Sequence, residues 1–307
     1  MSISAKQLTK LAVLAAAVAG LMTVGAGHAR AATVVCGQVI TQDTKVSNDL
    51  LDCPADGLVI GAANIKLDLG GHLIDGDDLS GGGSDDGVDN TGGFDNVEIK
   101  HGLIQQFDQG VNLLGASGND IHQLEVLLNR SGIALVTGSD NNTVERNVVH
   151  ENERVGGILA DGTTGNTISR NTVYLNGSPG IGSVGIGVFN STNAEVGNND
   201  VFDNAMSGIW LVNADASLVK GNQVQTSGFD GIQSFSGSTG NLFVGNDTSN
   251  NGWNGIEVGD PGNTITRNQA DDNFNLGIFA AAGNTDGGGN KASGNGDPAQ
   301  CVGVVCS

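Results

Sequence analysis

The stretch from residue 142 to residue 280 repeats one pattern of apolar and polar positions six times. The first residues of the six units are Asn142, Asn166, Ala194, Ser217, Asn241 and Asn263. The steps between these starts are 24, 28, 23, 24 and 22 residues. A fixed period of this length is typical of a solenoid, in which each repeat forms one turn.

Each unit places an apolar residue two positions after its start and a polar residue, an Asn in every unit, three positions later. A second polar position follows after five residues, and a Gly-Ile pair opens the last segment. Short β-type runs between Asn and Gly corners favour three strands per turn, and they leave no room for a helix of roughly 10 residues. We therefore expect an all-β solenoid.

Equivalent residues of such a solenoid stack at roughly 4.8 Å, the spacing of neighbouring strands in a sheet. The repeated apolar positions then form one continuous core. The Asn columns are interpreted as structural, because Asn tolerates the left-handed backbone of a tight corner and its amide can bond to the Asn of the next turn.

The sequences NTISRN and NTITRN and the recurring Gly-Ile pairs resemble the parallel β-helix repeat of the pectate-lyase-like group, over roughly residues 64–295. The resemblance implies a single-stranded right-handed parallel β-helix, a handedness that parallel crossovers also favour. We expect about nine coils of 22–28 residues, with three strands in each. The group includes lyases, hydrolases, epimerases and non-catalytic surface proteins, so the resemblance leaves the function open.

The chain divides into four predicted segments. Residues 1–31 are expected to be a secretory signal peptide, because Lys6 and Lys10 precede a short apolar run and a small-residue cleavage site ends at Ala31. Residues 32–62 are expected to be an N-terminal cap, 63–295 the β-helix and 296–307 a C-terminal cap. No further apolar stretch is long enough for a transmembrane segment. The protein is therefore expected to be secreted, periplasmic or at the cell surface.

All four cysteines lie near the ends of the chain, Cys36 and Cys53 before the repeats and Cys301 and Cys306 after them. About nine coils at roughly 4.8 Å place the two ends some 40 Å apart, which is beyond the reach of a disulfide. The spacing therefore predicts one disulfide between Cys36 and Cys53 and another between Cys301 and Cys306.

The formal net charge is −20. Such an acidic chain repels nucleic acid, and we expect no nucleic-acid partner. The acids concentrate between residues 75 and 93, where the period is interrupted. A flexible acidic loop is one interpretation, and a Ca²⁺ site is the other, since carboxylates on a Gly-rich loop suit a hard cation. The calcium hypothesis names Asp77, Asp78, Asp85 and Asp86.

The strand that starts with the Gly-Ile pair should point its Ile inward and the next residue outward. The outward positions of successive turns carry Phe189, Trp210, Gln233, Phe235, Glu257 and Phe279. Aromatic rings beside amide and carboxylate groups suit the apolar faces and hydroxyls of sugars. Alternatively, the rings pack beneath the loop at 176–185 or against a neighbour.

A catalytic constellation is less evident than a binding face. A glycosidase needs two carboxyl groups about 5 to 10 Å apart, and Glu257, the one catalytic candidate, has no clear acidic neighbour in the outward rows. Arg146 and Arg170, which a lyase could use, adjoin the Asn corner. We expect a protein that binds an extracellular or cell-envelope polysaccharide. The alternative is a polysaccharide-modifying lyase, glycoside hydrolase or epimerase.

Overall fold

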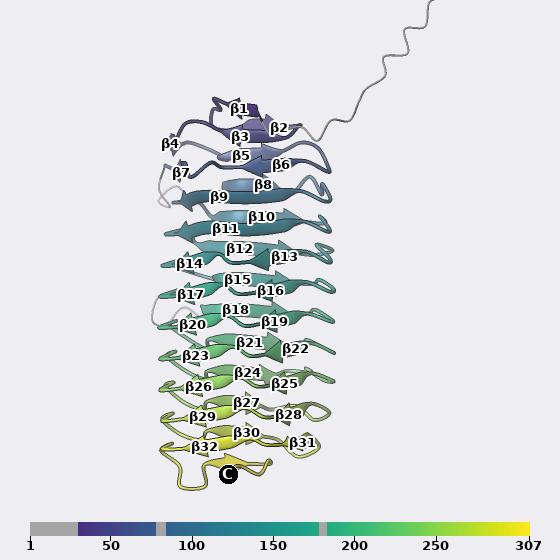
Figure 1. The fold of residues 1–307 in the computed structure, drawn as a ribbon, viewed down its shortest axis with the longest axis vertical. Helices are drawn as coiled ribbons and strands as arrows, with labels where there is room; N and C mark the ends of the chain where they lie inside the picture. The colour runs from purple at the N-terminus through teal and green to yellow at the C-terminus, as the bar shows by residue number, and fades with distance from the viewer. Residues whose placement is uncertain (1–29, 78–83, 178–182) are drawn as a thin grey trace, which may run out of the picture.

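The computed structural model describes residues 30–77, 84–177 and 183–307. Within these ranges the chain forms only β-strands, which wind turn upon turn into a tall solenoid (Figure 1). The part of the chain that the structure describes includes no helix that could cross a membrane. Residues 1–29 of the predicted signal peptide lie outside the described ranges.

One strand of each turn belongs to a parallel sheet of 12 strands, here called sheet B. Its strands are β2 (Gln38–Ile40), β5 (Leu58–Ile60), β8 (Asp86–Asn90), β10 (Gln109–Leu114), β12 (Ser131–Val136), β15 (Gly156–Asp161), β18 (Val184–Phe189), β21 (Ile209–Val212), β24 (Ile232–Phe235), β27 (Ile256–Val258), β30 (Ile278–Ala280) and β33 (Cys301–Val302).

The other two strands of each turn form a bent sheet of 21 strands, here called sheet A. The first of the two sheet A positions in each turn is held by β1 (Arg30–Ala32), β3 (Thr44–Val46), β6 (Lys66–Asp68), β13 (Thr143–Glu145), β16 (Thr167–Ser169), β19 (Glu195–Gly197), β22 (Leu218–Lys220), β25 (Leu242–Val244), β28 (Thr264–Thr266) and β31 (Thr285–Gly288). The strands that complete the turn are β4 (Leu50–Cys53), β7 (Leu73–Gly76), β14 (Val148–His150), β17 (Thr172–Tyr174), β20 (Asp200–Phe202), β23 (Gln223–Gln225), β26 (Asp247–Ser249), β29 (Gln269–Asp271) and β32 (Lys291–Ser293). Two longer strands, β9 (Glu98–Gln105) and β11 (Asp120–Leu127), cover both positions.

The parallel pairing confirms the register predicted from the repeats. Val144 pairs with Ile168, and Ile168 pairs in turn with Val196. All three side chains are fully buried. Aliphatic columns of this kind fill the interior from the first turns to the last, so that each turn buries its apolar face against its two neighbours.

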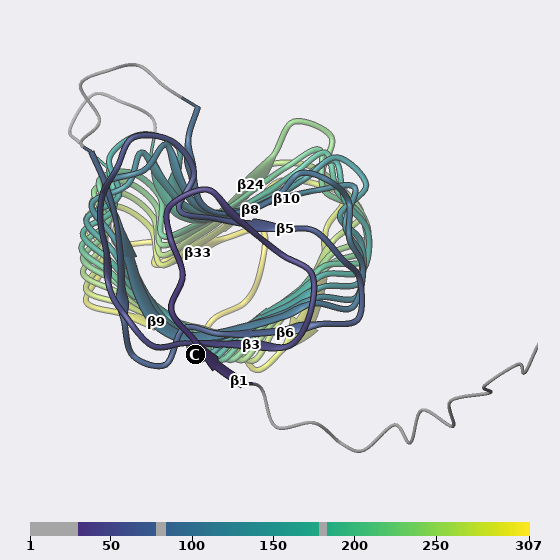
Figure 2. The ribbon, with the colours of Figure 1, turned by 90° about the horizontal axis from the view of Figure 1, so that it is seen from above.

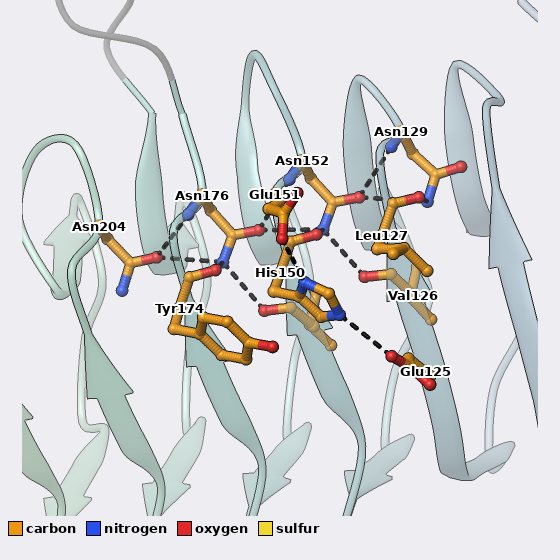
Figure 3. A network of polar contacts seen from close by, with 11 residues as sticks. Glu125, Val126, Leu127, Asn129, His150, Glu151, Asn152, Tyr174, Asn176 and Asn204 are labelled. Carbon is orange, nitrogen blue, oxygen red and sulfur yellow. Dashed lines mark hydrogen bonds and ion pairs between the residues drawn. The ribbon is translucent and has the colours of Figure 1, made fainter. Parts of the chain in front are cut away.

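The Asn columns form the expected ladders. Asn147 donates from Nδ2 to the Oδ1 of Asn171 at 3.0 Å, and Asn171 donates to Asn199 at 3.1 Å. A second ladder runs through Asn152 and Asn176, as Figure 3 shows. Each Nδ2 also donates to a backbone carbonyl, so these buried amides are satisfied where the chain turns.

The solenoid has about eleven turns, more than the nine expected, since the described part of sheet B contains twelve strands. The difference lies mainly at the N-terminus, where β2 pairs with β5 and β4 pairs with β7. Residues 32–62, predicted as the N-terminal cap, contribute strands to both sheets, and Ile40 and Leu58 are buried in the same core.

Both predicted disulfides are confirmed. Cys36 bonds to Cys53 with a Cα–Cα distance of 5.4 Å. Cys301 bonds to Cys306 with a Cα–Cα distance of 6.1 Å. Each disulfide therefore closes a short loop at one end of the solenoid.

Candidate functional site

Sheet B presents its outer surface between two sets of projecting loops, as the view along the solenoid shows (Figure 2). We call the outward side chains of this sheet from β10 to β30 the sheet B face. Parallel pairing stacks equivalent residues of successive turns, so this face consists of columns along the solenoid axis. Each turn contributes one residue to each column, so an extended ligand along the axis would meet a new residue of the same column at every turn.

The centre of the face carries three aromatic side chains in mutual contact. The ring of Trp210 meets Phe189 edge to face with 5.6 Å between centroids, and it lies 5.4 Å from Phe235 at a tilt of 49°. Gly187 makes this arrangement possible, since a Cβ at that position would lie 2.9 Å from the Phe189 ring. All three aromatic side chains are half-buried, so part of each remains open to solvent.

The remaining predicted face residues follow Trp210 in one column. Gln233 pairs with Trp210, Glu257 with Gln233, and Phe279 with Glu257. Gln233 is only 6% exposed, because its amide oxygen is turned to the buried Ser207 hydroxyl, which donates to it at 3.0 Å. It therefore supports the floor of the face, whereas Glu257 and Phe279 are half-buried.

Glu257 has an acidic neighbour, contrary to the sequence-based expectation. Asp230 precedes the Gly-Ile pair of its turn and is fully buried. The Asn254 backbone N–H donates to its Oδ1 at 2.8 Å, and the Asn254 side chain donates to Glu257 at 2.9 Å. Burial, and then the charge of Glu257, raise the pKa of Asp230 to about 8. At neutral pH Asp230 therefore keeps its proton.

A sequence signal for Asp230 exists in the column just before each Gly-Ile pair. Side chains of this column contact the next turn on the sheet B face: Ser207 reaches Gln233, and Asp86 accepts from the Asn112 amide at 2.8 Å. Strand alternation assigns a direction only to the residues that follow the Ile. The polar residues that recur before the Gly are the sequence signal for a second, buried polar column.

Asp86, one of the predicted calcium ligands, is buried on the sheet B side. Burial is the main cause that raises the pKa of Asp86 to about 8, so its carboxyl is neutral at pH 7 and a poor ligand for Ca²⁺. Asp77 is exposed, Asp85 is half-buried, and Asp78 lies outside the described residues. Within the described ranges no group of three or more acidic, His or Cys side chains is arranged to hold a metal. The calcium site stays a prediction.

A pocket of about 470 Å³ lies at the N-terminal half of the sheet B face, and two arginines contribute to its lining. The sequence-based prediction of the face does not include these arginines. Val136 and Leu159 contribute the apolar floor, and Arg130 and Arg154 contribute guanidinium groups. Arg130 forms an ion pair with Asp108 at 3.1 Å. Asp108 also lines this pocket, so its lining carries both basic and acidic side chains.

Three further aromatic residues form an exposed row where the chain enters sheet B. Phe229, Trp253 and Phe274 are 37%, 39% and 70% exposed. Their rings stack, with centroid distances of 6.3 Å between Phe229 and Trp253 and 6.1 Å between Trp253 and Phe274. We call these residues the exposed aromatic row. Phe229 and Trp253 directly precede Asp230 and Asn254 in the sequence.

The family that matches the sequence is described as the right handed beta helix region, and it covers residues 40–185 and 180–296. The chain belongs to the right-handed β-helix family. The search of curated proteins found no match to this β-helix.

Several solved structures share the fold at low sequence identity. The A-module of a mannuronan C-5 epimerase from Azotobacter vinelandii is 14% identical with a TM-score of 0.50, and the match covers 88% of this β-helix and 91% of that chain. A DFA-IIIase from Arthrobacter chlorophenolicus A6 without its lid is 15% identical with a TM-score of 0.55, covering 85% and 74%. The catalytic domain of an alpha-1,3-glucanase in complex with nigerose is 11% identical with a TM-score of 0.55, covering 91% and 62%.

Sheet A of this β-helix carries a competing aromatic cluster, of which Figure 3 shows His150 and Tyr174. His150 stacks on Tyr174 with centroids 4.6 Å apart, and Tyr174 stacks on Phe202 at 4.9 Å. The His150 ring nitrogens lie 3.3 Å from Glu125 and 3.2 Å from Glu151. In this cluster the nearly parallel rings stack face to face, whereas the ring of Trp210 meets Phe189 edge to face.

Proposed function

We propose that this β-helix binds a polysaccharide along the sheet B face, with Trp210 at the centre of the site. The observation that carries the proposal is the meeting of Phe189, Trp210 and Phe235 from successive turns on one partly open surface. Ring faces cover the C–H faces of sugars, and the nearby Glu257 carboxylate accepts hydrogen bonds from hydroxyls. The solved β-helices named as a mannuronan epimerase and a glucanase support a glycan as the ligand class.

A polymer suits this surface better than a compact molecule. Equivalent side chains recur at roughly 4.8 Å along the axis, so a chain lying parallel to the axis contacts several turns at once. The flanking loops limit the directions in which a ligand can lie (Figure 2). A polysaccharide aligned with the axis therefore gains a contact with each turn without any change in the protein.

The substitution Trp210→Ala tests the position of the site. We expect a loss of about 1 to 3 kcal/mol in glycan binding, the scale of a lost aromatic contact. The ligand is the glycan that binds most tightly on a glycan array, and affinity is measured by calorimetry. Phe202→Ala is the control, because it removes an aromatic ring from sheet A. Unchanged affinity of Trp210→Ala, with the wild-type circular dichroism retained, would place the site elsewhere.

A second candidate function is modification of the bound polysaccharide, with Glu257 as the acid–base group. The specific observation in its favour is the buried Asp230, whose pKa is raised to about 8 by burial and by the charge of Glu257, because a pair of carboxyl groups with separated pKa values can divide the roles of acid and base. Asp230 is fully buried and would position Glu257 and set its protonation.

Product analysis tests this second candidate. Incubation with the bound glycan should release new reducing ends if the reaction is hydrolysis, or unsaturated ends if it is elimination. Glu257→Gln should abolish either product while glycan binding persists, and Asp230→Asn should shift the pH profile of the rate. Binding without any chemical change in the glycan would leave a binding protein.

The cysteines support a location of the protein outside the cytoplasm. The two disulfides support an oxidising environment, outside the cell or in the periplasm, where such bonds persist. Polysaccharides of the envelope or matrix are accessible there. The signal peptide stays a prediction from the sequence.

A further inference from the structure

The acidic pair of Asp230 and Glu257 lacks the cationic partner that several partly buried acids on sheet A have. On sheet A, Glu98 pairs with Lys66 and Lys100, and Glu145 pairs with Arg146 and Arg170. Glu195 pairs with Lys220 at 2.9 Å. In the described ranges no ion pair forms at Asp230 or Glu257, whose polar neighbour is the neutral Asn254.

The sequence explains why no cation reaches this pair. From residue 183 to residue 307 the only basic residues are Lys220, Arg267 and Lys291, and no histidine occurs there. Lys220 and Lys291 lie in β22 and β32 of sheet A, and Arg267 lies between β28 and β29 of the same sheet. The C-terminal half of the sheet B face therefore carries carboxyl groups and no basic side chain.

An aromatic side chain follows Glu257 in its own column. Phe279 of the next turn pairs with Glu257, and both side chains are half-buried. A carboxylate beside an open aromatic ring is a combination that favours an organic ammonium group, because the carboxylate pairs with the charge and the ring attracts it through its face. One oxygen of the buried Asp230 accepts no hydrogen bond from any described residue, so the pair has capacity for a further partner.

We propose that the C-terminal half of the sheet B face binds an amino-sugar polysaccharide, with a protonated amino group of the glycan beside Glu257 and Phe279. This proposal rests on the proposed glycan-binding function and specifies its ligand. A uronate unit is disfavoured at this position, because its carboxylate would lie against a partly buried carboxylate with no cation between them. A neutral sugar would leave the acidic pair uncompensated.

The opposite half of the face provides an internal contrast. Arg130 and Arg154 line the pocket near β12 and β15, where an anionic unit would find guanidinium groups. A preference of the whole protein for uronates would therefore indicate that the N-terminal half dominates recognition. The choice between the two halves can be read from the charge of the preferred glycan.

The experiment compares three oligosaccharides of equal length by calorimetry in a slightly acidic buffer with a metal chelator. They are oligomers of glucosamine, N-acetylglucosamine and galacturonate. The glucosamine oligomer should bind at least about tenfold more tightly than the other two, and its affinity should fall as salt is added. Glu257→Gln should remove most of this preference, because it should weaken binding of the glucosamine oligomer more than binding of the N-acetylated oligomer.

Asp247→Asn is the matched control, because it removes one negative charge from sheet A at the same level of the solenoid and should keep the preference. If the N-acetylated or galacturonate oligomer binds as tightly as the glucosamine oligomer in a Trp210-dependent manner, the amino-sugar inference fails and the proposed function survives. If Asp247→Asn removes the preference as effectively as Glu257→Gln, net charge explains it and the site assignment fails. If none of the oligomers nor any arrayed glycan binds, both proposals fail.

Discussion

Two buried carboxyl groups on the sheet B side, those of Asp86 and Asp230, lie far apart in the sequence but occupy the same repeat position and therefore one column of the fold. Each keeps one oxygen without a hydrogen-bond donor among the described residues. Such groups cost stability when they ionise, and a β-helix that retained them for stability alone would gain more from an apolar side chain. Their position on the candidate face therefore favours a role in binding or catalysis.

The raised pKa of Asp86 makes stability depend on pH. The folded pKa of about 8 exceeds the ordinary value of 3.8, so the folded state holds a proton that the unfolded state has released between these values. The contribution to the free energy of unfolding is therefore complete below about pH 4 and is lost as pH rises towards and through about 8. Asp86→Asn cannot ionise and should be most stabilising, relative to wild type, near pH 9.

Urea unfolding at mildly acidic and at alkaline pH measures this effect. Asp203→Asn is the control, since it removes an exposed carboxyl group from the sheet A side and should shift the free energy of unfolding little at either pH. An equal gain of Asp86→Asn over wild type at both pH values would show that Asp86 ionises in the folded state as it does in the unfolded chain.

The sequence predicts part of the candidate site. Trp210, Phe189 and Phe235 are predictable because the repeat period and the alternation of the strand decide which residues face outward. Asp230 and Trp253 were missed because they lie just before the strand, where the chain turns and alternation no longer fixes the direction of a side chain. The contact between Asp230 and Glu257 also depends on a diagonal neighbour in the next turn, which a single repeat does not reveal.

At the scale of the strand, three residues per element are enough because pairing is continuous along the solenoid. An isolated strand such as β16, with Thr167, Ile168 and Ser169, could not persist alone. It pairs on one side with β13 and on the other with β19, and the Asn171 ladder fixes its C-terminal corner. Regular Asn and apolar positions made these strands predictable, whereas β2 and β4 lack the Asn signature and were assigned to a cap.

At the scale of the whole molecule, stability should be distributed by turn, since each turn contacts only its neighbours. The disulfides then protect the ends where unfolding can start. The Cys36–Cys53 bridge spans 17 residues and the Cys301–Cys306 bridge spans 5, so loop entropy alone gives about 3 and about 2 kcal/mol. Cys53 is also fully buried in the core, which adds a packing loss when it is truncated.

The double variant Cys36→Ala/Cys53→Ala should therefore lose more stability than Cys301→Ala/Cys306→Ala, by about 1 kcal/mol or more in urea unfolding. Hydrogen exchange should rise first in the turns from β1 to β7 in the former variant and in the turns from β30 to β33 in the latter. The central turns around Trp210 should stay protected in both variants, because their neighbours remain in place. Loss of protection along the whole solenoid in either variant would mean that the turns unfold as one cooperative unit and that the ends control the stability of the candidate site.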